Sequence, residues 1–311
     1  MDKKAGPSLK RGGGTMKERS SKSVMLFLLS LALILACGPH GRAAAGVGAD
    51  LAEQFLAKTP ISTVDPAMTA DAAAKAQEEF IAVIGRELGD PVGYKVGLTN
   101  PNMQKALGVS QPVRGTMLNN MMRESGVVMP VAFGSVPFCE GGLIVRVGDW
   151  AVNGAKTPEE TLKWLDAVIP FTELSDMVFA GGVKLTAPAV AAVNVGVRYG
   201  VMGDPIKLSP TPEWIARLKT FSVRVVDEKG TLIEEGRGKA LMGDPLAAVL
   251  WIRDSLAAEG KELVKGDLLS LGSLTKPILP RPGMTVRSIY TGLDPKGSVE
   301  ISVGFEEEDH G

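Results

Sequence analysis

The side chains that most often carry out acid–base chemistry are nearly absent from the body of this chain. Its two histidines, His40 and His310, stand near the ends, and its two cysteines are Cys37 and Cys139. A Ser-His-Asp triad or an H-E-x-x-H metal site needs histidines inside the folded core, so the sequence argues against both. Two cysteines cannot build a disulfide framework or a four-cysteine zinc site. Catalysis must therefore use Asp, Glu, Lys, Ser, Thr, Tyr or the backbone.

Short motifs of common enzyme classes do not account for the chain. Gly196, Gly200 and Gly203 lack the dinucleotide-binding spacing, and there is no Walker A sequence. Ser273-Leu274-Thr275-Lys276 matches the S-x-x-K pattern of serine acylases, but their Ser-Asp-Asn and Lys-Thr-Gly partners are absent from the sequence. Carboxylates remain, and their oxygens are the ligands that hard divalent cations prefer. The sequence thus points to a Mg²⁺ or Mn²⁺ site.

A larger set of motifs runs along most of the chain. In order these are Gly93–Thr99 (GYKVGLT), Met103-Gln104, Leu107–Val109, Gln111-Pro112, Gly243–Leu246 (GDPL), Lys265–Asp267, Gly272–Thr275 with Pro277, and Pro282-Gly283. Together they resemble the 2-keto-4-pentenoate hydratase family, which also includes 4-oxalocrotonate decarboxylases and belongs to the fumarylacetoacetate hydrolase superfamily. The resemblance implies an α+β fold, a mixed β-roll or sandwich with a few flanking helices, assembled as a homo-oligomer.

The resemblance also implies a metal site of three carboxylates. Glu140 and Glu173 match two of these ligands, and Gly142 stands where relatives have the second acid of an E-x-E pair. Losing one carboxylate removes a charge and an oxygen ligand, although Mg²⁺ commonly keeps several waters. We therefore expect Glu140 and Glu173 to bind Mg²⁺ or Mn²⁺ with reduced affinity.

The same resemblance assigns catalytic and substrate-binding residues. The catalytic candidates are Lys95, which matches the family's active-site lysine, and Ser273. The substrate-binding candidates are Asn194, Gly272 and Thr275. The chain departs from its relatives at Val113 and Val193, where they carry Asp. The loss at Val113 removes a group implicated in proton handling, and losing a general acid or base typically costs about 10²–10⁴-fold in rate.

Each candidate also has a structural interpretation, which the sequence leaves open. Lys95 could lie at the surface of an edge strand, and Glu140 and Glu173 could be solvated acids. Asn194 could satisfy backbone groups. Ser273 and Thr275 could be hydroxyls that cap turns.

These residues must be positioned by many short strands and a few separated helices. Apolar spacing and capping residues predict helices near 51–57, over 71–88, from Thr157 to about Val168, over 244–260, and a short one ending at Leu107. Predicted strands cover 93–98, 143–147, 191–197, 267–271, 284–290 and 298–305, with a hairpin of 221–226 and 231–234. This mixture predicts an α+β fold.

The N-terminus has the pattern of a secretory signal. Seven basic residues within 1–23 precede an apolar run from Val24 to Ala36, which is shorter than the about 20 residues that span a bilayer. Ile34–Cys37 resembles a lipobox, in which Cys37 is lipidated. The alternatives are cleavage after Ala43–Ala45 and an uncleaved anchor. We expect a chain that is exported, as a periplasmic protein or a membrane-anchored lipoprotein.

These observations divide the chain into a signal segment (1–36), a lead-in (37–70), a hydratase-like catalytic domain (71–305) and an acidic tail (306–311). Beyond residue 36 there are 27 basic and 33 acidic residues, a net charge of about −6. Such a chain without a basic stripe is not expected to bind nucleic acid. Membrane contact is expected only through the lipid anchor.

Three functions remain open at this stage. The first is a metal-dependent lyase that adds water to a 2-hydroxy-2,4-dienoate to give a 4-hydroxy-2-oxoacid. The second is an exported, non-catalytic descendant that binds a small 2-oxo or 2-hydroxy acid or a partner protein. The third is a different reaction on the same fold, such as C–C bond hydrolysis or tautomerisation.

Overall fold

The computed structural model describes residues 46–99, 104–105 and 108–307. The predicted signal segment, the lipidation candidate Cys37 and most of the predicted short helix ending at Leu107 lie outside these residues. The described residues form one compact unit, so the part of the lead-in that is described folds together with the rest.

The larger sheet carries most of the candidate residues. Its strands follow the order β2-β1-β11-β5-β6-β7-β3, and β8 pairs with β6. The strands are β1 (Pro91–Gly97), β2 (Val113–Leu118), β3 (Met122–Glu124), β5 (Pro137–Val147), β6 (Leu165–Asp176), β7 (Val197–Met202), β8 (Ile206–Lys207) and β11 (Leu268–Ser273). The pairs β1–β11 and β3–β7 are parallel, and the other pairs are antiparallel.

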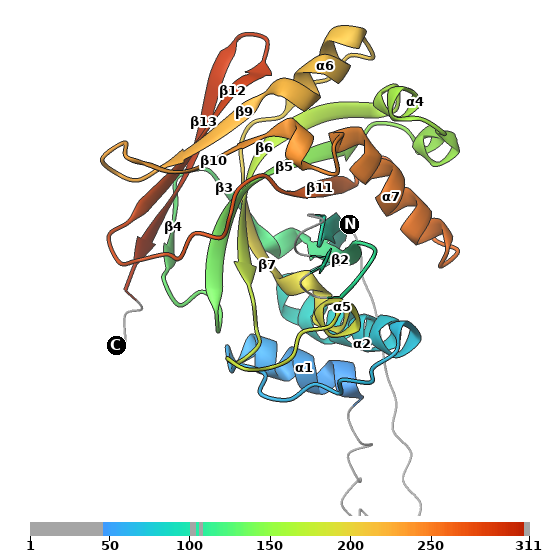
Figure 1. Cartoon of the computed structure of the whole chain (residues 1–311), viewed down its shortest axis with the longest axis vertical. Helices are drawn as coiled ribbons and strands as arrows, with labels where there is room; N and C mark the ends of the chain where they lie inside the picture. Colours follow the sequence, from blue (N-terminus) through green and yellow to red (C-terminus); the bar gives the residue numbers. More distant parts are fainter. Residues whose placement is uncertain (1–45, 100–103, 106–107, 308–311) are drawn as a thin grey trace, which may run out of the picture. The chain divides into compact units, whose positions relative to one another are not determined.

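A smaller sheet packs on the larger one (Figure 1). It has the order β10-β9-β12-β13-β4. Its strands are β4 (Val127–Pro130), β9 (Ser222–Val226), β10 (Leu232–Arg237), β12 (Thr285–Asp294) and β13 (Gly297–Glu306). Tyr290 of β12 joins the two sheets, since its hydroxyl lies 2.8 Å from the Gly142 carbonyl oxygen and 2.7 Å from that of Phe171.

Helices cover the sheets at two places (Figure 1). They are α1 (Val47–Leu56), α2 (Ala70–Leu88), α4 (Pro158–Leu162), α5 (Ala187–Ala192), α6 (Pro212–Thr220) and α7 (Pro245–Ala257). One apolar cluster, which includes Phe55 of α1 and Phe80 of α2, packs these helices and α5 against the larger sheet. A second cluster fills the space between the sheets and includes the buried side of α7. The predicted α+β class, with mixed sheets and few helices, is confirmed.

Two sequence-based assignments are wrong. The helix that begins after Thr157 ends at Leu162 rather than near Val168, because Leu165–Asp176 is a central strand buried between β5 and β7. Residues 191–196 of the predicted strand 191–197 are not a strand, and β7 begins only at Val197. Thr186 caps α5 by accepting a hydrogen bond from the Ala189 amide, and the following turn places Asn194 and Val195 at φ of 55° and 58°.

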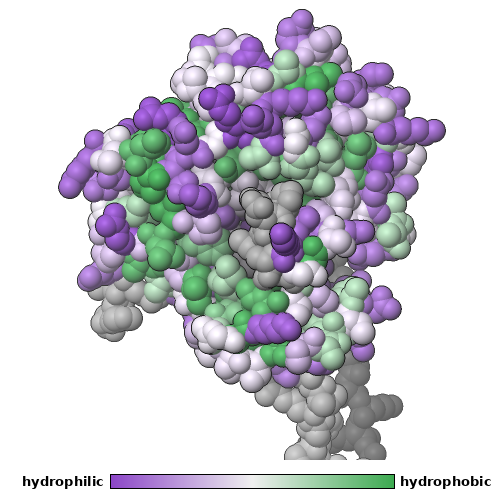
Figure 2. Space-filling model, in the orientation of Figure 1, coloured by the Kyte–Doolittle hydropathy of each residue, from purple (hydrophilic) through white to green (hydrophobic). Residues whose placement is uncertain are grey.

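Apolar and polar side chains are interspersed over the face shown in Figure 2, with an apolar stretch over the strands of the smaller sheet. Among the residues of the smaller sheet, Val128 of β4 and Leu232 of β10 are 55% and 45% exposed. Within the part of the chain that the structure describes, no helix combines the length and apolar character that a membrane crossing requires.

Candidate active site

Strand pairing brings four of the candidate residues together. Glu140 of β5 lies directly opposite Glu173 of β6. On the other side of β5, Ser273 of β11 pairs with Gly142. Lys95 of β1 pairs with Ser270 of β11. Because β1, β11, β5 and β6 are consecutive in the sheet, side chains distant in sequence meet on one face.

Glu173 is the centre of this group. It is 1% exposed. The Lys95 Nζ lies 3.0 Å from Glu173 Oε2, and Ser270 Oγ donates to Glu173 Oε1 over 2.6 Å. Lys95 is also buried and donates to Ser175 Oγ at 2.9 Å. A buried carboxylate needs such partners, because an unpaired buried charge is strongly destabilising. Lys95 is therefore a buried ion-pair partner, not a surface lysine.

Ser273 connects the two glutamates. Its Oγ lies 2.7 Å from Glu140 Oε2 and 3.2 Å from Glu173 Oε2. Burial and the nearby Glu173 carboxylate raise the pKa of Glu140 to about 7, although Lys95 and Ser273 lower it. A serine hydroxyl has one proton to donate. Without a cation, a proton on Glu140 lets Glu140 donate to Ser273 while Ser273 donates to Glu173.

Gly272 and Thr275 fix the backbone of the segment that carries Ser273. Gly272 adopts φ of 100°, and a Cβ there would meet Thr99 Oγ1 at 2.9 Å, so both backbone and space favour glycine. The register of β11 against β5 shifts between Ser270 and Ser273. The Thr275 hydroxyl accepts from the Gly141 amide at 2.9 Å and thereby ties this segment to β5.

Asn194 lies outside this cluster. It is fully buried, and its side chain accepts from the Thr116 amide at 2.6 Å and donates to the Thr116 carbonyl oxygen at 2.8 Å. These contacts match its structural interpretation, the satisfaction of backbone groups. The adjacent Val193 lines the pocket described next. Val113, on β2, pairs with Gly97 of β1 and is not among the lining residues.

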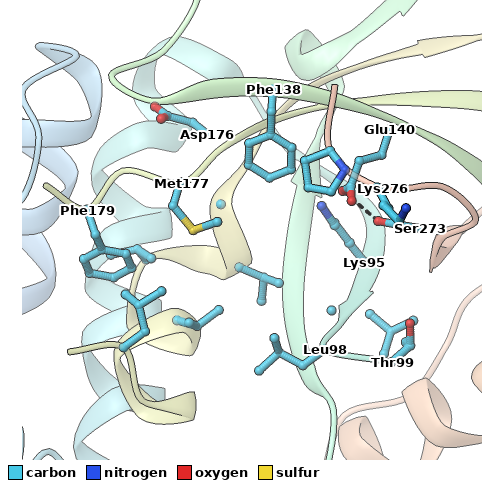
Figure 3. Close-up of a pocket in the computed structure, with 18 of the residues that line it drawn as sticks. Lys95, Leu98, Thr99, Phe138, Glu140, Asp176, Met177, Phe179, Ser273 and Lys276 are labelled. Atoms are coloured by element: carbon cyan, nitrogen blue, oxygen red, sulfur yellow. Dashed lines mark hydrogen bonds between the residues drawn. The ribbon is translucent and has the colours of Figure 1, made fainter. Parts of the chain in front are cut away.

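Glu140, Lys95 and Ser273 of this cluster line one end of a pocket with a cavity volume of about 280 Å³, whereas Glu173 is not among the lining residues. Figure 3 shows Glu140 and Ser273 joined by a hydrogen bond at one end and Met177 and Phe179 at the other. Lys95, Thr275 and Lys276 also line the polar end. The pocket therefore has a charged end built on strands and an apolar end built on the segment after β6 and on α5.

Sequence reasoning missed Asp176, a further acid in the pocket wall. It is fully buried and accepts hydrogen bonds from the amides of Ser135, Val136 and Val178, from the Ser135 hydroxyl and from Arg198 Nε. Arg198 also donates to the Phe55 carbonyl oxygen and lies over the Phe55 ring. This ion pair joins the pocket wall to α1. The sequence signal for Asp176 is an acidic residue at the end of a largely apolar strand.

Glu140 and Glu173 have the donor chemistry for a hard cation. Their like charges face each other across adjacent strands, and the resulting repulsion helps to raise the pKa of Glu140. A divalent cation would remove that repulsion, and oxygen ligands suit Mg²⁺. No cluster of three His, Cys, Asp or Glu side chains able to hold a metal ion occurs within residues 46–99, 104–105 and 108–307. Water or substrate would complete the coordination.

Comparisons with known proteins agree on one family. No protein-family model matches the chain. A 4-oxalocrotonate decarboxylase from a Pseudomonas species is 28% identical over 248 residues, which cover 80% of this chain and 92% of that protein. A 2-keto-4-pentenoate hydratase from Paraburkholderia xenovorans is 28% identical over 193 residues, 62% of this chain and 69% of that protein.

A solved structure shows the same fold. It is the 4-oxalocrotonate decarboxylase from Pseudomonas putida G7 complexed with magnesium and adipate, with a TM-score of 0.72, 24% identity, and coverage of 83% of this chain and 95% of that chain. The likeness agrees with the fold implied by the sequence motifs. The chain is thus similar in sequence to 2-keto-4-pentenoate hydratases and 4-oxalocrotonate decarboxylases, and it shares the fold of a solved 4-oxalocrotonate decarboxylase.

Proposed function

We propose that the chain is a lyase that adds water to a 2-hydroxy-2,4-dienoate and releases a 4-hydroxy-2-oxoacid. The observation that carries the proposal is the contact of Lys95 and Ser273 with the paired carboxylates of Glu140 and Glu173 at one end of a pocket. Buried acid, base and hydroxyl groups in hydrogen-bond contact are suited to moving protons on a bound acid.

The reaction needs two proton movements and one addition. The dienoate loses the proton of its 2-hydroxyl and gains one at C5, which gives a 2-oxo compound with a C3–C4 double bond. Water then adds its oxygen to C4 and a proton to C3. Lys95 is placed to hold or deliver a proton and to attract the substrate carboxylate. Ser273 is placed to pass a proton between the two glutamates.

Glu140 and Glu173 would hold Mg²⁺ or Mn²⁺ in this proposal. A bound cation supplies Lewis-acid stabilisation of charge on the substrate oxygens. Gly142 leaves one family carboxylate absent, and Lys95 already neutralises part of the charge on Glu173. Both features support weaker cation binding than three free carboxylates would give.

The proposal is tested by identifying the product in deuterated water. The full chain is incubated with 2-hydroxypenta-2,4-dienoate, and with a homologue carrying a longer alkyl group, with Mg²⁺. We expect the 4-hydroxy-2-oxoacid with deuterium at C3 and C5 by proton NMR. Appearance of only the 2-oxo tautomer would mean that the chain is a tautomerase. Lys95→Met should abolish product, while Glu300→Gln, at an exposed ion pair of the smaller sheet, should not.

A second candidate is a non-catalytic descendant that binds a small oxoacid. It is supported by the two contacts that occupy the Lys95 ammonium and by the apolar Val113 in place of an acid. Under this alternative a saturated 2-oxoacid raises the melting temperature, yet no dienoate is consumed with any divalent cation. Turnover that Glu173→Gln abolishes would exclude it.

We further propose that the chain is exported and forms a homo-oligomer. The support for export is the basic segment and apolar run before Cys37. Mass spectrometry of the mature N-terminus, with Cys37→Ala as control, separates lipidation at Cys37 from cleavage after Ala45. Light scattering of the mature protein gives the subunit number.

A further inference from the structure

Apolar side chains make up much of the pocket lining away from Glu140 and Ser273. The described lining there includes Phe138, Met177, Phe179, Leu185, Val190 and Val193. These residues come from the start of β5, the segment after β6 and the region around α5. In Figure 3, Phe138 projects between the polar end and Met177. An acid bound at Lys95 and Ser273 would have to place its remaining atoms against these side chains.

No cation is available in this apolar end among the residues described. The charged lining residues are Lys95, Glu140, Asp176 and Lys276. Asp176 accepts four hydrogen bonds from the segment 135–136 and from Val178, and it is also paired with Arg198 at 3.0 Å. The Lys276 side chain is 84% exposed and lies 3.9 Å from Glu234, next to the polar end. A second carboxylate in the apolar end would therefore be buried without a partner, which is costly.

The apolar wall is held in place by the backbone. The Ile61 amide donates to the Val178 carbonyl oxygen at 2.7 Å, and the Ala180 amide donates to the Ile61 carbonyl oxygen at 2.9 Å. These hydrogen bonds fix the backbone of the segment that carries Met177 and Phe179. The wall is thus a preformed surface, the usual condition of a small-molecule site.

Backbone strain is concentrated at the same wall. Leu98, Val178 and Val195 have φ of 55°, 53° and 58°. Residues other than glycine, and β-branched residues above all, rarely adopt this left-handed backbone conformation, because it is sterically strained. Strain of this kind persists where the surroundings enforce it, commonly at ligand sites. Three such residues within or next to the apolar lining indicate that its shape is functional.

We propose that the site selects a 2-oxo or 2-hydroxy monocarboxylic acid whose distal end is an apolar alkyl or aryl group, and that it rejects acids with a distal carboxylate. The inference rests on the proposed function for the position of the acid head. The head lies against Lys95 and Ser273, and the tail lies among Met177, Phe179 and Val193. These wall residues determine specificity and take no part in the chemistry.

The test measures the binding of acids that cannot react. Calorimetry of the full chain with Mg²⁺ compares 2-oxopentanoate, 2-oxooctanoate and 2-oxooctanedioate. A buried methylene contributes about 0.8 kcal/mol, or about fourfold in affinity. We expect 2-oxooctanoate to bind at least about tenfold tighter than either other acid. Equal binding of the three acids, or no binding by any, overturns the inference.

Two variants test whether the apolar tail of the bound acid lies against Met177. Met177→Lys places a cation at the apolar end and should shift the preference toward the dioate by about tenfold or more. Met177 is 40% exposed, so the change is compatible with folding. Leu232→Lys, at a similarly exposed position of β10, should leave the preference unchanged. A Met177→Lys preference equal to that of the unmodified chain overturns the inference.

The outcomes also separate this inference from the proposed function. Tight binding of 2-oxooctanoate without turnover of any dienoate would retain the apolar specificity and reject the lyase. Turnover of the short dienoate without a preference for longer acids would retain the lyase and reject the apolar specificity.

Discussion

The substitution Gly142→Glu tests whether cation binding is limited by the absent carboxylate. A Cβ at position 142 would lie 3.2 Å from Glu173 Cγ and 3.4 Å from Phe171 Cδ1, so it points toward the glutamate pair. Neighbours must shift by a few tenths of an ångström. The backbone is held by Tyr290, whose hydroxyl lies 2.8 Å from the Gly142 carbonyl oxygen. Gly142→Gln adds the same bulk without charge and is the matched control.

The negative charge of Gly142→Glu should strengthen cation binding, an effect that the uncharged side chain of Gly142→Gln cannot have. Unit charges about 4 Å apart interact by roughly 4 kcal/mol at an effective dielectric constant of 20, and desolvation offsets most of this gain. We expect Gly142→Glu to bind Mg²⁺ about tenfold to a hundredfold more tightly than Gly142→Gln. Without a cation, Gly142→Glu should be the less stable of the two, because it adds a third negative charge.

Calorimetric titration with Mg²⁺ and urea unfolding with and without Mg²⁺ measure both effects. Equal Mg²⁺ affinities of the two variants would refute the assignment of the cation to Glu140 and Glu173. A metal-free Gly142→Glu protein as stable as Gly142→Gln would show that position 142 does not face the glutamates.

Three further predictions concern stability and reactivity. Lys95→Met leaves Glu173 buried without its cation and should lower the free energy of unfolding by about 3–5 kcal/mol, whereas Arg146→Met, at a half-exposed pair, should cost about 1 kcal/mol or less, both by urea unfolding. The pKa of Glu140 is raised from 4.5 to about 7, so the folded metal-free protein binds this proton more tightly than the unfolded chain. Its stabilising contribution should be lost as the pH rises from about 4.5 to 7, and Glu140→Gln should remove this dependence; a pH-independent difference between the two proteins would contradict it. Burial raises the pKa of Cys139 to about 12, so Cys139 should resist iodoacetamide in the native protein and react only after unfolding, as mass spectrometry of the peptide that contains it would show.

The candidate residues could be named from the sequence because they lie in motifs that the chain shares with a known family. The motifs assigned Lys95, Glu140, Glu173 and Ser273 from their surroundings in sequence, and the four meet on consecutive strands. Ser270 was missed although its single hydroxyl lies within a buried apolar strand. Ser270 pairs with Lys95 of β1 and donates a hydrogen bond to Glu173. The local sequence does not reveal these contacts between strands.

The errors arose where tertiary contacts overrode local signals. The caps at Thr157 and Thr186 both begin helices. The apolar run after Leu162 is compatible with a helix, but it pairs with β5 on one side and β7 on the other. The turn at Asn194 depends on the amide contact with Thr116, a residue 78 positions earlier. Such partners cannot be read from one segment.

The most direct test of the central claim follows the ultraviolet absorbance of 2-hydroxypenta-2,4-dienoate and of its longer alkyl homologue with the full chain. The rates are compared with Mg²⁺, with a chelator, and for Glu173→Gln with Mg²⁺. The account predicts loss of absorbance by the unmodified chain with Mg²⁺ and none in the other two cases. Unchanged absorbance of both dienoates with saturating Mg²⁺, or equal rates for Glu173→Gln, would contradict it.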